Sequence, residues 1–215
     1  MFFSKLPRLM SSVAFHFAEP PARGRRPAIF LDRDGVINEG VVGGYVTSWS
    51  AFRFLDGIIP ALAGLSRFRL PLIVVSNQAG VGKRLMGRMT LGDITRRFVA
   101  HLARAGIHVA AAYYCPHTSE AGCRCRKPRP GLLFQAAHER RVDLSRSILL
   151  GDSLTDMEAA RAAGCRGILF EQQDRCGANQ LLKSGPAASP GIVTVRQISH
   201  VPWQAAALLE RYHGG

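Results

Sequence analysis

The stretch AIFLDRDGVIN, residues 28–38, decides the fold of this chain. It opens with four apolar residues, 28–31, which is the length and character of a strand buried in a parallel sheet. The run stops at Asp32, and Asp34 and Gly35 follow directly. Ligands of open α/β sheets bind at the carboxyl ends of the strands, so these two acids are the first candidate functional residues.

The rest of the chain alternates between short apolar runs and stretches with helical spacing. Further strands are predicted at residues 70–75, 109–114, 147–150, 167–170 and 191–195. Helices are predicted at residues 58–68, 90–104, 132–140 and 155–163. An amphipathic helix is predicted at 201–213; we expect it to dock on its own sheet, with dimerisation as the alternative. Thr90 is the expected N-cap of the second helix and Gly164 the expected C-cap of the fourth. The alternation predicts an α/β fold, a doubly wound parallel sheet with helices on both faces.

Length and composition favour one folded domain. The 215 residues can bury a sizeable core, and 47% hydrophobic with 20% charged residues is ordinary for a globular protein. We expect residues 27–213 to form that domain and residues 1–26 to form an N-terminal extension without order, because it runs into the linker EPPARGRRP. A targeting peptide is the alternative for the extension, but its apolar stretch is short and broken and no clear cleavage site follows it.

Cysteine usage and hydropathy bear on the cellular compartment. Five clustered cysteines are too few for a disulfide framework in a chain of this length, which favours a reducing cytoplasm. No apolar run approaches the roughly 20 residues that cross a bilayer, so we expect no membrane partner.

The chain is strongly basic. It carries 28 Lys and Arg against 15 Asp and Glu, a formal net charge of +13, which favours an anionic partner. This charge alone does not separate nucleic acid from small phosphorylated molecules. No aromatic stripe accompanies the basic residues, however, and a nucleic-acid-binding protein has no need of acids at strand tips, so we expect no nucleic acid.

Acidic residues follow two of the predicted strands. Asp32 and Asp34 lie two apart, and Asp152 and Asp156 belong to the motif GDSLTD after residues 147–150. Carboxylates brought close together repel unless a cation lies between them, and Mg²⁺ favours such oxygen ligands. The alternatives are an Asx-rich turn for the first pair and, for Asp156, an acid that favours the start of a helix.

Groups that suit a phosphate lie in two further motifs. Lys127, in the motif CRKP, supplies a point charge, and Ser76, in VVSNQAG, supplies a hydroxyl. A transferring phosphoryl group needs this kind of electrostatic stabilisation. The neighbouring Asn77 and Gln78 add amides for substrate binding. The segment GVGKR, residues 80–84, is not a P-loop because no Ser or Thr follows its lysine.

These four motifs, DRDG, SNQ, RKP and GDxxxD, stand in the order and surroundings of the haloacid dehalogenase superfamily, which the chain resembles over residues 28–170. The resemblance implies a phosphatase that forms an aspartyl-phosphate intermediate. It also implies that Ser76 and Lys127 hold the phosphoryl oxygens.

The same resemblance assigns the acids. Asp32 becomes the nucleophile and Asp34 the general acid and then base. Asp32, Asp152 and the backbone carbonyl of Asp34 become Mg²⁺ ligands, and Asp156 supports the metal site.

A cysteine-rich loop precedes Lys127. Cys115, His117, Cys123 and Cys125 form the pattern CxHx5CxC, and three thiolates with one imidazole match a closed, tetrahedral structural Zn²⁺ site. The spacing differs from common zinc fingers, and the alternative is a set of reduced loop cysteines, or a disulfide if the protein is exported.

The cysteine pattern narrows the resemblance to a branch of small phosphatases that act on heptose bisphosphate or histidinol phosphate and have no large cap domain. In this branch the zinc loop leads directly into RKP, which places Arg126 to bind a second phosphate. Gly44 and Tyr45 match a GYV substrate segment of the heptose enzymes, so heptose 1,7-bisphosphate dephosphorylated at C7 is the expected reaction.

Departures from that pattern lie in the substrate-facing loops. The segment EGVVGG is longer and richer in glycine, NQAGVGKRLMG differs, and the zinc loop is as short as in histidinol phosphatases. Histidinol phosphate, or a polynucleotide 3′-phosphate, is therefore the alternative substrate. The resemblance suggests a monomer.

Overall fold

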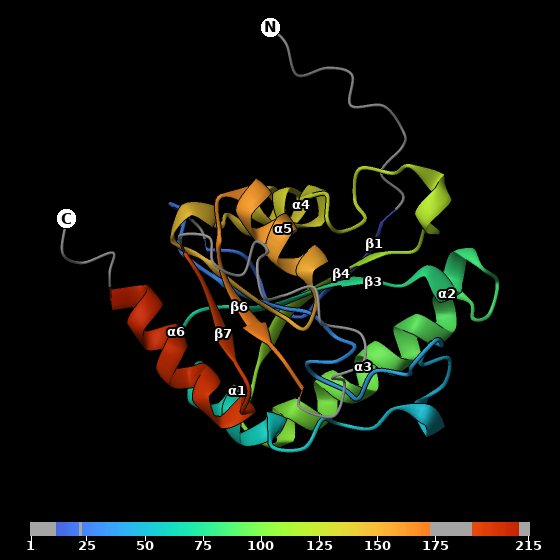
Figure 1. Ribbon diagram of the computed structural model, residues 1–215, viewed down its shortest axis with the longest axis horizontal. Coiled ribbons are helices and arrows are strands. Elements are labelled where there is room, and N and C mark those ends of the chain that lie inside the picture. The colour runs from blue at the N-terminus through green and yellow to red at the C-terminus, as the bar shows by residue number, and fades with distance from the viewer. Residues whose placement is uncertain (1–11, 22, 173–190, 211–215) are drawn as a thin grey trace, which may run out of the picture.

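The computed structural model describes residues 12–21, 23–172 and 191–210, and they build a sheet with helices on both faces (Figure 1). The sheet has seven strands in the order β1-β4-β3-β2-β5-β6-β7. The strands are β1 (Val13–His16), β2 (Ile29–Leu31), β3 (Leu72–Asn77), β4 (Val109–Cys115), β5 (Ile148–Gly151), β6 (Arg166–Phe170) and β7 (Ile192–Val195). All pairings from β4 through β7 are parallel, and β1 alone pairs antiparallel among the described strands.

Helices cover both faces of this sheet. They are α1 (Ile58–Ser66), α2 (Ala79–Gly82), α3 (Arg88–Arg104), α4 (Gly131–Arg140), α5 (Leu154–Ala163) and α6 (Val201–Glu210). Short 3₁₀ turns lie at Trp49–Ala51, Ser119–Ala121, Leu144–Arg146 and Ile198–His200. Figure 1 shows α4 and α5 on one side of the sheet and α1, α3 and α6 on the other. This arrangement confirms the doubly wound α/β prediction.

The central strand shows how the sequence builds two cores. Side chains alternate across a strand, so Ile29 and Leu31 join the core beneath α1, α3 and α6, whereas Phe30 joins the core beneath α4 and α5. All three are at most 1% exposed. Burying each such side chain contributes about 1.5–3 kcal/mol, which is why a strand of three residues holds its place.

Most predicted elements are confirmed, and one predicted cap is wrong. Gly164 ends α5 with a φ of 76°, the left-handed conformation that glycine adopts readily. Helix α3, however, begins at Arg88 after an extended Gly87, so Thr90 lies within its first turn and is not the N-cap. The four-residue helix α2 is not predicted, because so short a segment carries no helical periodicity.

Strand β1 corrects the expectation for residues 1–26. Val13–His16 pairs with β4 and satisfies the hydrogen-bonding groups along that edge of the sheet. Polar contacts with α4 hold it: Ser12 Oγ donates to Gln135 Oε1 at 2.6 Å, and His16 Nε2 lies 3.2 Å from Glu139 Oε2. The expected lack of order is therefore wrong for this strand. Residues 1–11 lie outside the described residues, and the division into extension and domain stays a prediction.

The C-terminal helix docks on its own domain, as predicted, over the part that is described. Val201, Ala205 and Leu208 of α6 are buried, and Pro202 packs against Gly64 of α1 so closely that a Cβ there would lie 2.7 Å from it. Residues 211–213 lie outside the described residues. None of the described helices is both long and apolar enough to cross a membrane.

Candidate active site at the carboxyl edge of the sheet

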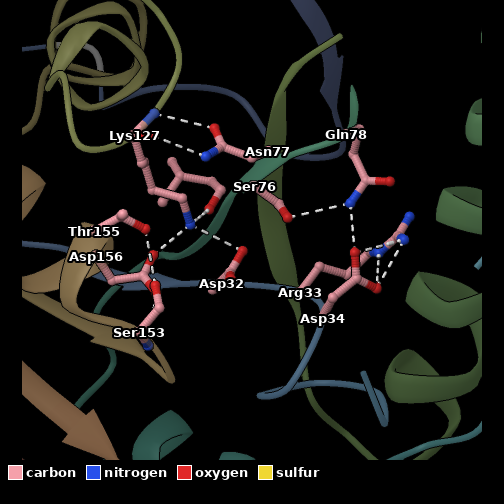
Figure 2. Close-up of polar contacts among 11 residues, drawn as sticks. Asp32, Arg33, Asp34, Ser76, Asn77, Gln78, Lys127, Ser153, Thr155 and Asp156 are labelled. Atoms are coloured by element: carbon pink, nitrogen blue, oxygen red, sulfur yellow. Dashed lines mark hydrogen bonds and ion pairs between the residues drawn. The ribbon is translucent and has the colours of Figure 1, made fainter. Parts of the chain in front are cut away.

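Three neighbouring strands bring their final polar residues to one edge of the sheet. Leu31 of β2 pairs with Val74 of β3 and Leu150 of β5, so the residues that follow these pairs lie side by side. The backbone N–H of Asp32 donates to Leu150 O at 2.9 Å, which continues the ladder one residue past the strand. Asp32 and Ser76, distant in sequence, meet there and share a hydrogen bond (Figure 2). Asp152 lies close to Asp32 at the same edge.

The centre of this edge is a carboxylate cluster with one buried ammonium group. One oxygen from each of Asp32, Asp152 and Asp156 lies within 4.8 Å of the other two. Lys127 Nζ lies 2.9 Å from Asp32 Oδ1, contacts Asp156 Oδ1, and donates to Val75 O at 3.0 Å (Figure 2). Lys127 is 4% exposed, so these contacts take the place of water around its charge.

The charges at this cluster do not balance. The pKa of Asp32 is raised from 3.8 to about 6: burial is the largest cause, Lys127 opposes it, and the charges of Asp156 and Asp34 act in the same direction as burial. Burial lowers the pKa of Lys127, but Asp156 and Asp32 together hold it above its ordinary value. Three carboxylates facing one ammonium group are short of positive charge, and a divalent cation with a preference for oxygen ligands fits this donor set.

Glycines let two of these carboxylates sit against the backbone. A Cβ on Gly35 would lie 1.8 Å from Asp152 Oδ2, and a Cβ on Gly151 would lie 2.3 Å from Asp156 Cβ. Asp156 is also the third residue of α5, and its Oδ2 accepts hydrogen bonds from the N–H and Oγ of Ser153. Asp156 therefore both lies in the first turn of a helix and contacts the buried cluster, so its position fits each of the two roles considered for it.

Asp34 points to different partners. Its carboxylate accepts from Arg33 and from Gln78 Nε2 at 2.7 Å (Figure 2). It also accepts from Asn38 Nδ2 at 2.9 Å. Burial raises its pKa, but the Arg33 charge and these hydrogen bonds outweigh burial and lower it. The Asp34 side chain is not part of the three-carboxylate cluster. The predicted metal ligand is its backbone carbonyl, and this ligand stays a prediction.

The two amides after Ser76 are engaged with protein groups. Asn77 Oδ1 accepts from Lys127 N and Asn77 Nδ2 donates to Lys127 O, both at 3.0 Å, which clamps the backbone that carries the lysine. Gln78 Nε2 bridges Asp34 and Ser76 Oγ. Positioning of the site is the role their contacts support, and substrate binding by either amide stays a prediction.

The four zinc-ligand candidates converge as a closed cluster. Cys115 Sγ lies 3.5 Å from both His117 Nδ1 and Cys123 Sγ, and Cys125 Sγ lies 3.3 Å from Cys115 Sγ and from His117 Nδ1. A tetrahedral zinc ion has ligand atoms roughly 3.5–3.8 Å apart, so the donor set and its spacing fit zinc. The three thiols are free in this structure, and no disulfide joins them.

Comparisons with known proteins agree with this geometry. The family model for HAD-hydrolase-like proteins matches residues 124–193. The D-glycero-beta-D-manno-heptose-1,7-bisphosphate 7-phosphatase of Photorhabdus laumondii is 38% identical over 144 residues, covering 64% of this chain and 76% of that protein. The D-glycero-alpha-D-manno-heptose-1,7-bisphosphate 7-phosphatase of Mycobacterium tuberculosis is 41% identical over 152 residues, covering 67% and 80%.

A solved structure of another heptose bisphosphate phosphatase has a similar fold. The D,D-heptose 1,7-bisphosphate phosphatase from B. bronchiseptica, complexed with magnesium and phosphate, is 32% identical with a TM-score of 0.74. The match covers 84% of this chain and 98% of that one.

The chain belongs to the heptose bisphosphate phosphatase family of haloacid dehalogenase-like hydrolases. It is a phosphoric monoester hydrolase.

Backbone carbonyls of the zinc-candidate loop, residues 115–125, accept hydrogen bonds from neighbouring parts of this phosphatase. Arg126 Nη1 donates to His117 O at 3.3 Å, and Gly82 N of α2 donates to Pro116 O at 2.8 Å. A Cβ on Gly82 would lie 2.6 Å from Pro116 O, so α2 lies directly on the loop. Arg126, which directly precedes Lys127, is therefore in contact with the loop backbone, and its placement over the active site stays a prediction.

The predicted substrate segment lies on the other side of α2. Tyr45 packs on Gly80, where a Cβ would lie 3.3 Å from its ring, and Lys83 Nζ lies 5.3 Å from the centre of that ring. Gly44 is exposed beside it. Substrate contacts of these residues stay predictions.

Sequence reasoning missed Arg33 and Asn38, both fully buried and both bonded to Asp34. The sequence offers a signal for Arg33, which lies between the two acids of DRD. A charged side chain that directly follows a buried strand needs a partner of opposite charge, and Asp34 is the nearest candidate.

Proposed function

We propose that this phosphatase is Mg²⁺-dependent and acts on a small sugar phosphate through an aspartyl-phosphate at Asp32, with heptose 1,7-bisphosphate dephosphorylated at C7 as the favoured substrate. The observation that carries the proposal is the buried ammonium of Lys127, 2.9 Å from Asp32 within a cluster of three carboxylates. The magnesium and phosphate in the related solved structure support the same assignment.

The metal has an evident set of ligands. Asp32, Asp152 and the backbone carbonyl of Asp34 would hold Mg²⁺, with Asp156 as support. When bound, Mg²⁺ supplies the positive charge that reduces repulsion between a carboxylate nucleophile and a phosphate dianion.

The side chains of this chain then divide the reaction between them. The negative charge of the bound phosphate raises the pKa of Asp34, which takes up a proton. The Asp32 carboxylate then forms a bond to phosphorus while the bond from phosphorus to the sugar oxygen breaks, and Asp34 gives that oxygen its proton. In the second step Asp34 takes a proton from water as the water oxygen attacks phosphorus, and the bond to Asp32 breaks. Lys127 and Ser76 stabilise the phosphoryl oxygens during both steps.

The related enzymes and the residues beside the site both bear on the substrate. The related enzymes are named for both anomers, beta in one and alpha in the other, so the similarity supports heptose bisphosphate without choosing the anomer. Arg126, with its guanidinium beside the zinc-candidate loop, is the residue we propose for the second phosphate, and Tyr45 with Gly44 for the sugar.

The test is Mg²⁺-dependent phosphate release from a panel of substrates. The panel contains both heptose 1,7-bisphosphate anomers, histidinol phosphate and a 3′-phosphorylated oligonucleotide. We expect kcat/KM for one heptose anomer to exceed that for the last two by at least about 100-fold, because histidinol phosphate has no second phosphate and the oligonucleotide offers only singly charged phosphodiesters in its place. A preference for histidinol phosphate or for the oligonucleotide would contradict the proposed substrate. Absence of phosphate release from all four substrates would contradict the proposed phosphatase mechanism.

The cysteine cluster supports a second prediction, on zinc. We expect the purified protein to contain one zinc ion per chain by elemental analysis. Cys125→Ser should lose that zinc and lower activity by more than about 10-fold, because Arg126 and Lys127 follow directly on the loop. The matched control is Cys165→Ser, a buried free thiol outside the cluster, which should keep both zinc and activity. Full activity in a zinc-free Cys125→Ser protein contradicts the prediction.

Monomeric state and a cytoplasmic location are part of this proposal and rest on the resemblance and on the cysteine usage alone.

A further inference from the structure

Arg33 is a buried charge for which the proposed reaction has no use. It lies between Asp32 and Asp34 in sequence and is 0% exposed. Burying a guanidinium group costs several kcal/mol unless a partner compensates it. Because a buried guanidinium group beside the nucleophile is costly, we expect the contacts that Arg33 makes to have a function.

The Arg33 side chain is directed entirely at Asp34. Nε donates to Asp34 Oδ1 at 3.1 Å, and Nη2 donates to Oδ1 at 2.8 Å and to Oδ2 at 2.9 Å. Arg33 Nη1 makes no hydrogen bond within the described part of the chain. A planar fork that meets both oxygens of one carboxylate fixes its direction as well as its distance.

The fork itself is held in place. The backbone carbonyl of Arg33 accepts from Ile37 N at 2.8 Å and from Asn38 N at 3.0 Å, which closes the turn after the nucleophile. Asn38 then reaches back to Asp34 Oδ1 with its own side chain. One short turn thus determines where both the arginine and the carboxylate lie.

The Asp34 carboxylate is also linked to the phosphoryl-binding side of the site. Gln78 Nε2 lies 2.7 Å from Asp34 Oδ2 and 3.2 Å from Ser76 Oγ, and Figure 2 shows the carboxylate between the side chains of Arg33 and Gln78. Arg33 therefore holds Asp34 one hydrogen-bonded side chain away from the hydroxyl that would bind the phosphoryl group.

We propose that Arg33 is a positioning residue for proton transfer, whose guanidinium fixes the Asp34 carboxyl group beside the phosphoryl site so that it meets the oxygen of the leaving group. The inference rests on the proposed function, because it takes Asp34 as the proton donor. Arg33 itself touches neither substrate nor phosphorus in this proposal.

The role has a signature that a purely structural role lacks. A leaving group such as p-nitrophenolate departs without help, whereas an alkoxide must receive a proton as its bond to phosphorus breaks. Misplacing Asp34 should therefore slow the release of alcohols and spare the release of p-nitrophenol. The quantity to compare is kcat/KM, which reports on the steps up to formation of the aspartyl-phosphate. It leaves out hydrolysis of that intermediate, a step that is the same for every substrate and that also uses Asp34.

The experiment measures kcat/KM for Arg33→Met across phosphate esters from p-nitrophenyl phosphate to alkyl and sugar phosphates. We expect a loss of about 10- to 100-fold for the alkyl and sugar esters and less than about 3-fold for p-nitrophenyl phosphate, so that log kcat/KM falls more steeply with leaving-group pKa. Arg33→Lys, which keeps the charge and loses the fork, should give an intermediate slope.

Three further proteins separate the possible outcomes. Asp34→Asn should show the steep slope by itself, and adding Arg33→Met to it should change the slope little, because the two residues act as one unit. Arg140→Met removes another buried arginine, one that donates to Ala18 O outside the site, and should leave the slope unchanged.

An equal loss on every ester in folded Arg33→Met and Arg33→Lys proteins overturns the inference while the phosphatase assignment stands. Absence of wild-type activity on all esters instead contradicts the proposed function.

Discussion

Replacing Asp32 by asparagine should abolish turnover without weakening the fold. The amide keeps the size of the side chain but is no nucleophile toward phosphorus, so we expect phosphate release to fall by at least about 10³-fold. The stability of the metal-free protein should stay the same or rise. Burial and the neighbouring carboxylates already disfavour the charge at position 32, and asparagine carries none.

The stability effect has a definite pH dependence in metal-free buffer. The pKa of Asp32 in the folded protein is raised from 3.8 to about 6, so ionised Asp32 costs stability only at pH values above 3.8, and the cost is complete above about 6. The advantage of Asp32→Asn in thermal unfolding should therefore be absent below pH 3.8 and grow until about pH 6. The matched control is Asp93→Asn, a partly exposed aspartate of α3 that pairs with Arg97 away from the site, and it should keep full activity. Measurable turnover by Asp32→Asn would show that another group attacks phosphorus.

Replacing Lys127 by methionine should damage both stability and activity. The ammonium lies between Asp32 and Asp156, and its removal leaves two buried carboxylates facing each other. Breaking a buried ion pair by removing one partner costs about 3–5 kcal/mol, so urea unfolding in metal-free buffer should show a loss of that size. Activity should fall by about 10²- to 10³-fold, because the phosphoryl oxygens lose a positive charge.

Mg²⁺ separates these two effects of Lys127→Met. Added Mg²⁺ should restore part of the lost stability by neutralising the carboxylates, and it should restore little turnover because it cannot take the place of the lysine beside the phosphoryl oxygens. Lys83→Met, which removes an exposed lysine, should not change stability. Equal stability of Lys127→Met and wild type without metal contradicts the assigned ion pairs.

The layers of the fold were predictable because strand and helix periodicities are local. Apolar runs such as residues 28–31 and 147–150 predict buried strands, and Gly164 predicts the end of α5. Strand β1 was not predictable in the same way. Val13–His16 alternates between half-buried and exposed residues, and it is a strand because the edge of β4 lies beside it, a contact that no local pattern encodes.

The residue types of the site were also predictable, but their partners were not. Asp32, Lys127 and the four zinc-ligand candidates carry their chemistry in their identity and spacing. Nothing local indicates that Asn77 clamps the backbone of Lys127, fifty residues away, or that Gln78 connects Ser76 to Asp34. Those contacts depend on side-chain directions at the edge of the assembled sheet.

By itself, the sequence determined the fold class, the acids at the strand ends, the cation in the motif RKP, and the cysteine cluster, because these follow from periodicity and from short spacings along the chain. Only the tertiary structure decided that Arg33 is buried against Asp34 and that β1 closes the edge of the sheet. The physical reason is that burial and pairing are properties of surroundings, and surroundings come from segments far apart in the sequence.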